Sequence, residues 1–380
     1  MEIAKKVLEE LIKIDTSIPE GNESKACEYL AELFWEKAVK VEKIGEFPRE
    51  NIIAYFGNLY SDNILIITGH LDVAPSNTAT WKTNPYEPYE ENGKIFGRGS
   101  CDMKGGLAIS IEAIFRALEN GFLKDKLVIF AGTVDEETGA SSEMGAKLVS
   151  KYLKEKNIKP FGVILPEPNN DYKILKVNIG HRGVIWLECQ SKGKTMHPGS
   201  SVHNENNAII NMYKFINEVN MEIPRNPIIK DGIVGNSCRV THINSGLEGQ
   251  YKFVPDKCIC NLDIRVSPLS TNEKIMNIIS EIAKNNDIDV RCIRQANSSI
   301  IDKDEKIVKF ILNILEEEKQ AYEVCCASPV CDAHWFNEQG MKTVNTLGVS
   351  GGNVHVNDEF AMLDSFEKRI NILIKILKEF

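Results

Sequence analysis

The sequence lacks a long apolar run, a block of basic residues and any internal repeat, and each absence excludes a class of protein. No apolar stretch approaches the ~20 residues that span a bilayer, so we expect no contact with a membrane. Lysine and arginine number 45 against 54 aspartates and glutamates, which gives a formal net charge of −9. Because nucleic-acid binding depends on basic residues that neutralise phosphates, we expect no nucleic-acid partner.

The ten cysteines are scattered along the chain and form no paired zinc-binding motif. The closest pairs, Cys258 with Cys260 and Cys325 with Cys326, lack the C-x-x-C spacing of a zinc site. Charged side chains interrupt the first 24 residues, so these do not form the apolar segment of a secretory signal. We therefore expect a cytoplasmic protein whose thiols stay reduced and take no part in the chemistry.

The first half of the chain alternates between short apolar strands and amphipathic helices. Strands that are apolar on both faces and separated by helices indicate a parallel sheet covered on both sides. At 380 residues the chain is long enough for two or three domains. The predicted strands are residues 63–68, 126–134 and 161–165, and the predicted helices are 107–118 and 143–154.

The pattern changes after residue 176, because predicted strands then lie next to predicted strands. We interpret residues 177–292 as a smaller α+β domain on an antiparallel sheet, which interrupts a first domain formed by residues 1–176 and 293–380. The smaller domain contains predicted strands 183–189, 239–244, 257–266 and 289–293 and helices 205–219 and 272–285. The last part of the first domain contains helix 304–319, strand 342–347 and helix 363–380.

Four predicted strands each lead to a carboxylate or an imidazole. Open α/β sheets bind their ligands at the carboxyl ends of the strands, so we expect these groups to converge. Each has an ordinary explanation by itself, such as a core histidine, a solvated loop or a helix cap. The placement of all these residues together has no such ordinary explanation, because crowded carboxylates repel one another unless they share protons or hold cations. In chain order the residues are His70 and Asp72, Asp135 to Glu137, Glu167 and His355, and Asp102 adds a further acid before a predicted helix.

Histidine and carboxylate ligands without cysteine suit zinc, manganese or cobalt better than magnesium or calcium. Three ligand carboxylates and one bridging hydroxide would balance the charge of two divalent cations. Such a pair would lower the pKa of a shared water and polarise a substrate carbonyl. A further glutamate at the site can take the water's proton and pass it to a leaving amine. Asp72, two residues from His70 on an extended segment, is placed to orient the imidazole ring.

Seven motifs, in order from His70 to Phe360, point to one family. They are GHLDVAP, GRGSCDMKGG, DEETG, PEP, GKTMHPGSSVHNENNA, FVPDKCICNLDIR and GGNVHVNDEF. With these motifs essentially the whole chain resembles the M20 family of metallopeptidases and deacylases, which includes acetylornithine deacetylase, succinyl-diaminopimelate desuccinylase, aminoacylase and glutamate-type carboxypeptidases. The resemblance implies a zinc-exopeptidase-like α/β catalytic domain with a mixed, mostly parallel sheet. It also implies that the smaller α+β domain serves as a lid and for dimerisation.

The resemblance further implies two divalent metal ions per chain, Zn²⁺ with Co²⁺ or Mn²⁺ as alternatives. Asp102 would bridge the two ions, and Glu136 would be the general base. The choice of Glu136 as base and Glu137 as ligand rests on the resemblance alone. The implied metal ligands are His70, Asp102, Glu137, Glu167 and His355, with Asp72 supporting His70.

In the lid domain the resemblance implies residues that contact the substrate. His197, in TMHPGS, matches a histidine that stabilises the oxyanion. In several relatives this histidine comes from the neighbouring subunit. The alternative role of His197 is a helix-entry residue before Pro198. Arg265 and Arg182 match positions that bind a substrate carboxylate, for which the planar guanidinium is suited. Asn236 is a further substrate-side candidate, with a turn asparagine as the alternative. We expect a homodimer formed through the lid domain.

Two loops depart from the family pattern. Residues 252–255 (Lys-Phe-Val-Pro) lack the asparagine that relatives often carry before Val-Pro, and residues 327–332 replace a loop rich in glycine and threonine. Asp332 is therefore either a substrate-loop residue or a cap for the helix that follows. Because both loops lie where relatives hold the substrate, the substrate of one relative cannot be transferred to this chain.

We expect a di-zinc amide hydrolase that removes an acyl group from an N-acyl amino acid by attack of a metal-bridged hydroxide. The alternative is a dipeptidase or carboxypeptidase with the same metal site, since both substrate classes present a free carboxylate. A metal-binding protein without activity is disfavoured, because the general base and all implied ligands are present. A third hypothesis is an acidic oligomeric scaffold protein, in which the lid domain only pairs the subunits. Pairing of subunits through the lid domain does not, however, exclude catalysis.

Overall fold

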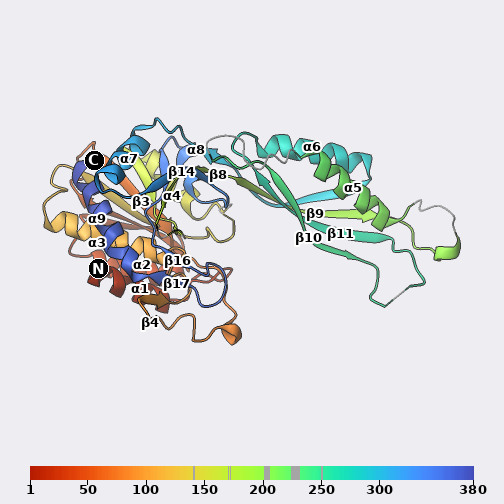
Figure 1. The fold of residues 1–380 in the computed structure, drawn as a ribbon, viewed down its shortest axis with the longest axis horizontal. Helices are drawn as coiled ribbons and strands as arrows, with labels where there is room; N and C mark the ends of the chain where they lie inside the picture. Colours follow the sequence, from red (N-terminus) through yellow and green to blue (C-terminus); the bar gives the residue numbers. More distant parts are fainter. Residues whose placement is uncertain (140–141, 170, 172, 201–205, 224–231, 250) are drawn as a thin grey trace. The chain divides into compact units, whose positions relative to one another are not determined.

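The computed structural model describes residues 1–139, 142–169, 171, 173–200, 206–223, 232–249 and 251–380 (Figure 1). The chain divides into two compact units. The large unit comprises Met1–Gly180, Ile301–Cys325 and Cys331–Phe380, and the small unit comprises His181–Ile300 and Cys326–Val330. The chain passes between units after Gly180 and Ile300, four and eight residues beyond the expected boundaries at 176 and 292. The short return at Cys326–Val330 had no counterpart in the sequence pattern.

The large unit is built on a mixed sheet. Its strands are β1 (Lys40–Glu46), β2 (Arg49–Gly57), β3 (Ile64–His70), β6 (Leu127–Thr133), β7 (Gly162–Leu165), β8 (Leu175–His181), β14 (Tyr322–Ala327) and β15 (Thr343–Asn345). The order is β1-β2-β6-β3-β7-β15-β8, with β14 beside β8. The strands from β6 to β15 are parallel, whereas β1 pairs antiparallel with β2, β2 with β6 and β8 with β15. The expected mixed α/β fold is confirmed, with its parallel pairings in the centre of the sheet.

Helices cover both faces of this sheet. One hydrophobic core joins one face to α1 (Glu2–Lys13), α2 (Glu23–Phe34), α3 (Lys104–Glu119), α7 (Lys306–Glu317) and α9 (Leu363–Glu379). A second core joins the other face to α4 (Ala146–Glu155) and α8 (Ala333–Glu338). In β2, Ile52 and Ala54 face the first core, whereas Ile53 and Tyr55 face the second. Because both faces are buried, the central strands are continuous apolar runs rather than alternating ones.

A small separate sheet holds two distant segments of the large unit together. Its strands are β4 (Tyr89–Glu91), β5 (Lys94–Phe96), β16 (Gly351–Gly352) and β17 (Phe360–Met362), in the order β16-β17-β5-β4. Strand β17 pairs antiparallel with β5, with Phe360 opposite Phe96. The chain that leaves β5 is therefore placed beside the chain that enters β17, and both carry predicted site residues.

The small unit has an antiparallel sheet with two helices on one face. Its strands β9 (Gly183–Lys192), β10 (Ser237–Ser245), β11 (Lys257–Val266) and β12 (Ile288–Ala296) lie in the order β10-β11-β9-β12. Helices α5 (Ala208–Glu222) and α6 (Asn272–Asn285) share a hydrophobic core with this sheet. Residues of β11 alternate between buried and partly exposed, as expected for a sheet covered on one face only.

Residue 205, where the predicted helix 205–219 begins, lies outside the described residues. Helix α5 begins at Ala208, because the side chain of Asn207 accepts a hydrogen bond of 3.0 Å from the backbone N–H of Ile209 and caps the helix. The remaining short elements are β13 (Ser299–Ile300), η1 (Thr78–Thr80) and η2 (Pro198–Ser200). Among the helices of the described residues, none has both the length and the apolar character to cross a bilayer.

Candidate active site

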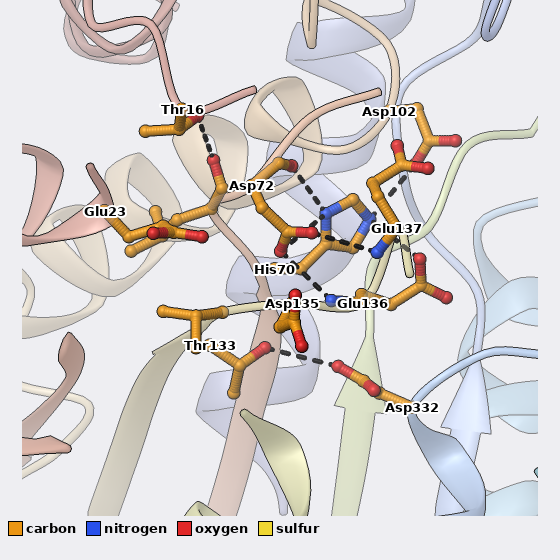
Figure 2. A network of polar contacts seen from close by, with 12 residues as sticks. Thr16, Glu23, His70, Asp72, Asp102, Thr133, Asp135, Glu136, Glu137 and Asp332 are labelled. Atoms are coloured by element: carbon orange, nitrogen blue, oxygen red, sulfur yellow. Dashed lines mark hydrogen bonds and ion pairs between the residues drawn. The ribbon is translucent and has the colours of Figure 1, made fainter. Parts of the chain in front are cut away.

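Five of the predicted site residues follow the parallel strands of the large unit and meet at one edge of its sheet. Figure 2 shows four of them, His70, Asp72, Glu136 and Glu137. His70 is the last residue of β3, and Asp72 follows it by two residues. Glu136 and Glu137 follow β6, and Glu167 follows β7. Because these three strands run in the same direction, their carboxyl ends lie at the same edge, as the sequence predicted.

Asp102 and His355 reach the same place from outside the parallel strands. Asp102 lies two residues before α3, and His355 lies between β16 and β17. The His70 Nε2 atom is 3.2 Å from Asp102 Oδ1, and the His355 Nε2 atom is 3.2 Å from Asp102 Oδ2. The two oxygens of one carboxylate therefore face two different imidazole rings.

Two groups of potential metal ligands result, and Asp102 belongs to both. One consists of His70, Asp102 and Glu167, and the other of Asp102, Glu137 and His355; within each group the ligand atoms lie within 4.8 Å of one another. Imidazole nitrogen and carboxylate oxygen are the donors that zinc and similar divalent ions take in catalytic sites with three protein ligands. The chemistry and spacing of these donors fit a pair of divalent ions.

The electrostatics of the site favour bound cations. Burial is the main factor that raises the pKa of Glu136 and Glu167 well above the usual value, and neighbouring carboxylates add to it against the opposing charge of His70. Burial alone would lower the pKa of His70, but the hydrogen bond to Asp102 and the surrounding negative charges raise it well above its usual value. So many carboxylates at one partly buried place repel one another, and divalent cations would compensate their charge.

Asp72 holds both His70 and the segment that carries Glu136 and Glu137. The ring atom Nδ1 of His70 is hydrogen-bonded to the backbone carbonyl oxygen of Asp72 at 2.9 Å, and the Asp72 carboxylate lies farther away, at 3.7 Å. That carboxylate accepts the backbone N–H groups of Glu136 at 3.2 Å and Glu137 at 2.9 Å. The expected contact with His70 is therefore made mainly through the carbonyl, while the side chain orients the two glutamates.

Asp135 begins the turn that presents Glu136 and Glu137, and its partner was not foreseen from the sequence. Its φ of 65° lies in the left-handed region. Arg49, from β2, donates a hydrogen bond of 2.8 Å to the Asp135 carboxylate and also binds the buried Glu23. Because Arg49 lies 86 residues before Asp135, no local pattern in the sequence indicated this contact.

Two glycines allow the loop of Glu167 to pack closely. A Cβ atom at Gly106 of α3 would lie 1.9 Å from the carbonyl oxygen of Pro166. A Cβ atom at Gly348 would lie 2.0 Å from the carbonyl oxygen of Glu167. Any larger residue at either position would displace this loop, so these glycines fix the backbone that carries Glu167.

Asp332 lies at the margin of the site in the large unit (Figure 2). It is buried, and its carboxylate accepts a hydrogen bond of 3.3 Å from the hydroxyl of Thr133. Although Asp332 precedes α8, its side chain makes no capping hydrogen bond. Its charge contributes to the raised pKa of Glu136 and of Glu167, so the carboxylate faces the site rather than the helix.

In the small unit, the three predicted substrate-binding residues lie near one end of β9. Arg265, in β11, binds the carboxylate of Asp263 through Nε at 2.8 Å and Nη2 at 3.0 Å. Arg182, just before β9, donates to Ser237 and Ser328 and to the carbonyl oxygen of Gly235, all neutral acceptors. The Asn236 side chain accepts the N–H of Ser267 at 2.7 Å, which is a structural contact of the kind expected for a turn asparagine.

His197 lies beyond the other end of β9. It is exposed, and its Nδ1 accepts the backbone N–H of Gly199 at 3.1 Å. The bridge between Met196 and Val254 holds this segment beside the chain that enters β11. His197 is thus separated from Arg182 by the whole length of β9.

Comparison with known proteins agrees with this arrangement. Residues 66–379 match the model of peptidase family M20/M25/M40. The chain is 26% identical over 414 aligned positions to a protein of Staphylococcus aureus (strain MSSA476) named probable succinyl-diaminopimelate desuccinylase, with 98% of this chain and 97% of that protein covered. The match spans both units of the structure.

Solved structures with the same fold include an M20 family metallo-carboxypeptidase from Sulfolobus solfataricus, with a TM-score of 0.82 at 19% identity over 100% of this chain and 99% of that one. Human carnosine dipeptidase 1 has a TM-score of 0.72 at 16% identity over 100% of this chain and 96% of that one. At these identities the likeness establishes the fold alone. The family match over most of the sequence establishes more: the chain belongs to peptidase family M20/M25/M40 and is a metal-dependent hydrolase of amide bonds.

Proposed function

We propose that this hydrolase removes an acyl group from an N-acyl amino acid whose carboxylate is free. The observation that supports this most strongly is the pair of three-donor groups sharing Asp102, beside Glu136, a partly buried glutamate with a raised pKa. The name of the S. aureus relative, of which the match covers 97%, favours an acylated amino acid as substrate. The products would be the free amino acid and the carboxylic acid of the acyl group.

The two groups of donors would hold two divalent metal ions. His70 and Glu167 would bind one ion and Glu137 and His355 the other, with Asp102 common to both. We propose zinc, with cobalt or manganese as alternatives, because the donors are nitrogen and oxygen without sulfur. When bound, the ions would polarise the scissile carbonyl and lower the pKa of a water molecule.

Glu136 is proposed as the general base. Its Oε2 atom lies 4.0 Å from His70 Nε2, but it belongs to neither ligand group. Burial raises its pKa, and a carboxylate with a raised pKa is suited both to accept and to return a proton near neutral pH. It would take a proton from the attacking water and deliver it to the amine nitrogen as the C–N bond breaks.

Arg182 and Arg265 are proposed to bind the substrate carboxylate, with Asn236 as a neighbouring contact. The Asp263 carboxylate already neutralises Arg265. Arg182 binds neutral acceptors only, as far as the described residues extend, so its positive charge remains available to an anion. Arg182 is therefore the stronger candidate of the two.

His197 is proposed to stabilise the oxyanion across a homodimer. The ten residues of β9 lie between Arg182 and the segment of His197, and they extend over about 30 Å. One small substrate cannot contact both side chains of the same chain. A dimer formed through the small unit would supply His197 from a second copy to a substrate held by Arg182.

The cytoplasm is proposed as the compartment of this protein. None of the ten cysteines, all of which lie in the described residues, forms a disulfide, although buried thiols such as those of Cys189 and Cys260 lie on adjacent strands. Reduced thiols are typical of proteins kept in a reducing compartment.

The proposal is tested by amine release from purified, metal-loaded protein. The panel contains N-acetylornithine, N-succinyl-diaminopimelate, simple N-acetyl amino acids and a set of dipeptides, with the Glu136→Gln protein as the blank. Turnover of acylated amino acids in preference to dipeptides supports the deacylase. Turnover of dipeptides alone would replace it by the alternative, a dipeptidase or carboxypeptidase with the same metal site; human carnosine dipeptidase 1, whose fold this chain shares, carries the name of such an activity.

A further inference from the structure

A buried ion pair lies beside the ligand groups without belonging to either. The Arg98 Nη1 atom donates to Glu359 Oε2 at 2.7 Å, and the two residues are 2% and 0% exposed. Burying both charges is costly unless their remaining polar atoms are also hydrogen-bonded. The partners of these atoms therefore indicate what the ion pair does.

Glu359 binds the segment that carries Asp102. Its Oε1 atom accepts the backbone N–H groups of Cys101 at 2.9 Å and Asp102 at 3.0 Å. Its Oε2 atom accepts the N–H of Gly99 at 3.2 Å in addition to the bond from Arg98. One carboxylate thus accepts four hydrogen bonds, and three of them fix the backbone from residue 99 to Asp102.

The same glutamate belongs to the segment that carries His355. Glu359 lies four residues after His355 and immediately before β17, which pairs with β5. Its hydrogen bonds therefore connect the loop of His355 directly to the loop of Asp102. These are the two ligands that reach the site from outside the parallel strands, so no strand pairing of the main sheet places them.

Arg98 extends the connection to a third ligand-bearing loop. Its Nε donates to the Ser76 hydroxyl at 2.8 Å, and Nη2 is 3.5 Å from the carbonyl oxygen of Pro75. Both residues lie in the loop that leaves β3 after His70 and Asp72. The guanidinium also lies over the ring of Trp81, 5.3 Å from its centroid.

We propose that Arg98 and Glu359 are positioning residues that set Asp102, the ligand common to both metal ions, relative to His70 and His355. This inference rests on the proposed metal site and adds to it the residues that hold its shared ligand. A neutral glutamine at position 359 keeps the size of the side chain, but its NH₂ group faces N–H donors and loses bonds that the carboxylate accepts. Both metal sites then weaken together, because Asp102 belongs to both.

The test compares Glu359→Gln with Glu367→Gln in the full-length protein. Glu367 forms an ion pair with Arg116 at the surface, so this control removes a glutamate charge without touching the site. Zinc affinity is measured by competition with a chelator, and the visible absorption spectrum of the cobalt-loaded protein reports ligand geometry. In Glu359→Gln we expect zinc affinity at both sites to fall about 10- to 100-fold and the cobalt spectrum to change. Glu367→Gln is expected to match the wild type.

Wild-type affinity and spectrum in a folded Glu359→Gln protein would overturn the proposal, even if its melting temperature were lower. If Glu359→Gln does not fold, Arg98→Lys decides the matter: it keeps the charge but loses the bond from Nε to Ser76. Weaker zinc binding in folded Arg98→Lys supports the proposal, and unchanged binding rejects it. If the wild type itself binds no divalent metal, the proposed metal site fails, and this inference fails with it.

Discussion

The two units place their functional residues in different ways. In the large unit, residues that follow β3, β6 and β7 meet at one edge, because these strands are parallel. In the small unit neighbouring strands are antiparallel, so their carboxyl ends alternate between the two edges of the sheet. Arg182 and the segment of His197 flank opposite ends of β9, whose ten residues span about 30 Å. A parallel sheet concentrates ligands at one centre, whereas an antiparallel sheet distributes contacts over both ends. Under the proposed function, the large unit would cleave the bond and the small unit would recognise the substrate.

The largest effect is expected in the large unit, from removal of the general base. Glu136→Gln should lower kcat by about 10³-fold, because proton transfer to and from the reacting groups is lost. Both metal ions should remain, since Glu136 belongs to neither ligand group. Amine release and elemental analysis measure the two properties. Glu143→Gln, whose side chain is 76% exposed, is the matched control, and substantial activity in Glu136→Gln would reject this role.

Removal of one imidazole should separate the two metal sites. His355→Ala is expected to reduce the metal content from two ions to about one per chain, because His355 belongs to only one ligand group. His242→Ala, an exposed histidine of β10, should retain both ions. Elemental analysis after gel filtration is the measurement. Two tightly held ions in His355→Ala would show that the ligands are allocated wrongly.

The small unit should affect catalysis only across a dimer. His197→Ala is expected to lower kcat about 100-fold through loss of an oxyanion donor. Mixing His197→Ala with Glu136→Gln should restore part of the activity, because some heterodimers then contain one intact site. If the mixture is no more active than its components, His197 and Glu136 of the same chain act at one site. That result would contradict the role of the small unit across a dimer.

Substitution of Arg182 should affect substrate binding more than turnover. Arg182→Ala is expected to raise KM about 10- to 100-fold, the loss typical of a hydrogen bond to a charged group. Arg291→Ala, which removes an exposed ion pair with Glu188 in the same unit, should leave KM unchanged. Steady-state kinetics with the best substrate of the panel measure both. A fall in kcat at constant KM would instead place Arg182 in the reacting centre.

The smallest effect concerns the buried interior of the large unit. Burial lowers the pKa of His334 to about 4, below the unfolded value of about 6.5. The unfolded chain therefore binds this proton first, and stability is lost as the pH falls from 6.5 towards 4. Near pH 5.5 the loss is about 1.5 kcal/mol. Urea unfolding of the wild type and of His334→Gln at pH 7.5 and 5.5 measures the free energy of unfolding, which should depend less on pH in the variant. An equal pH dependence in both proteins would contradict a lowered pKa of His334.

Local patterns predicted those elements whose signals are contained in a few residues. The helix predicted at residues 272–285 has the bounds of α6, because Thr271 caps it through a hydrogen bond of 3.1 Å to the N–H of Lys274. Strands β1 and β2 were not predicted. In particular, β1 has no buried residue, so no apolar alternation marks it, and its pairing with β2 defines it as a strand.

The sequence by itself indicated which histidines and carboxylates could serve as metal ligands, the strand ends that carry them and a chain in two parts, because apolar periodicity and residue chemistry are local properties. Only the tertiary structure decided that Asp102 faces both His70 and His355 and that Glu359 holds its loop. The Nε2 atom of His355 lies 3.1 Å from Oε1 of Glu137, although the two residues are 218 positions apart in the sequence. Such distances depend on strand pairing and on buried hydrogen bonds between distant loops, which no short stretch of sequence encodes.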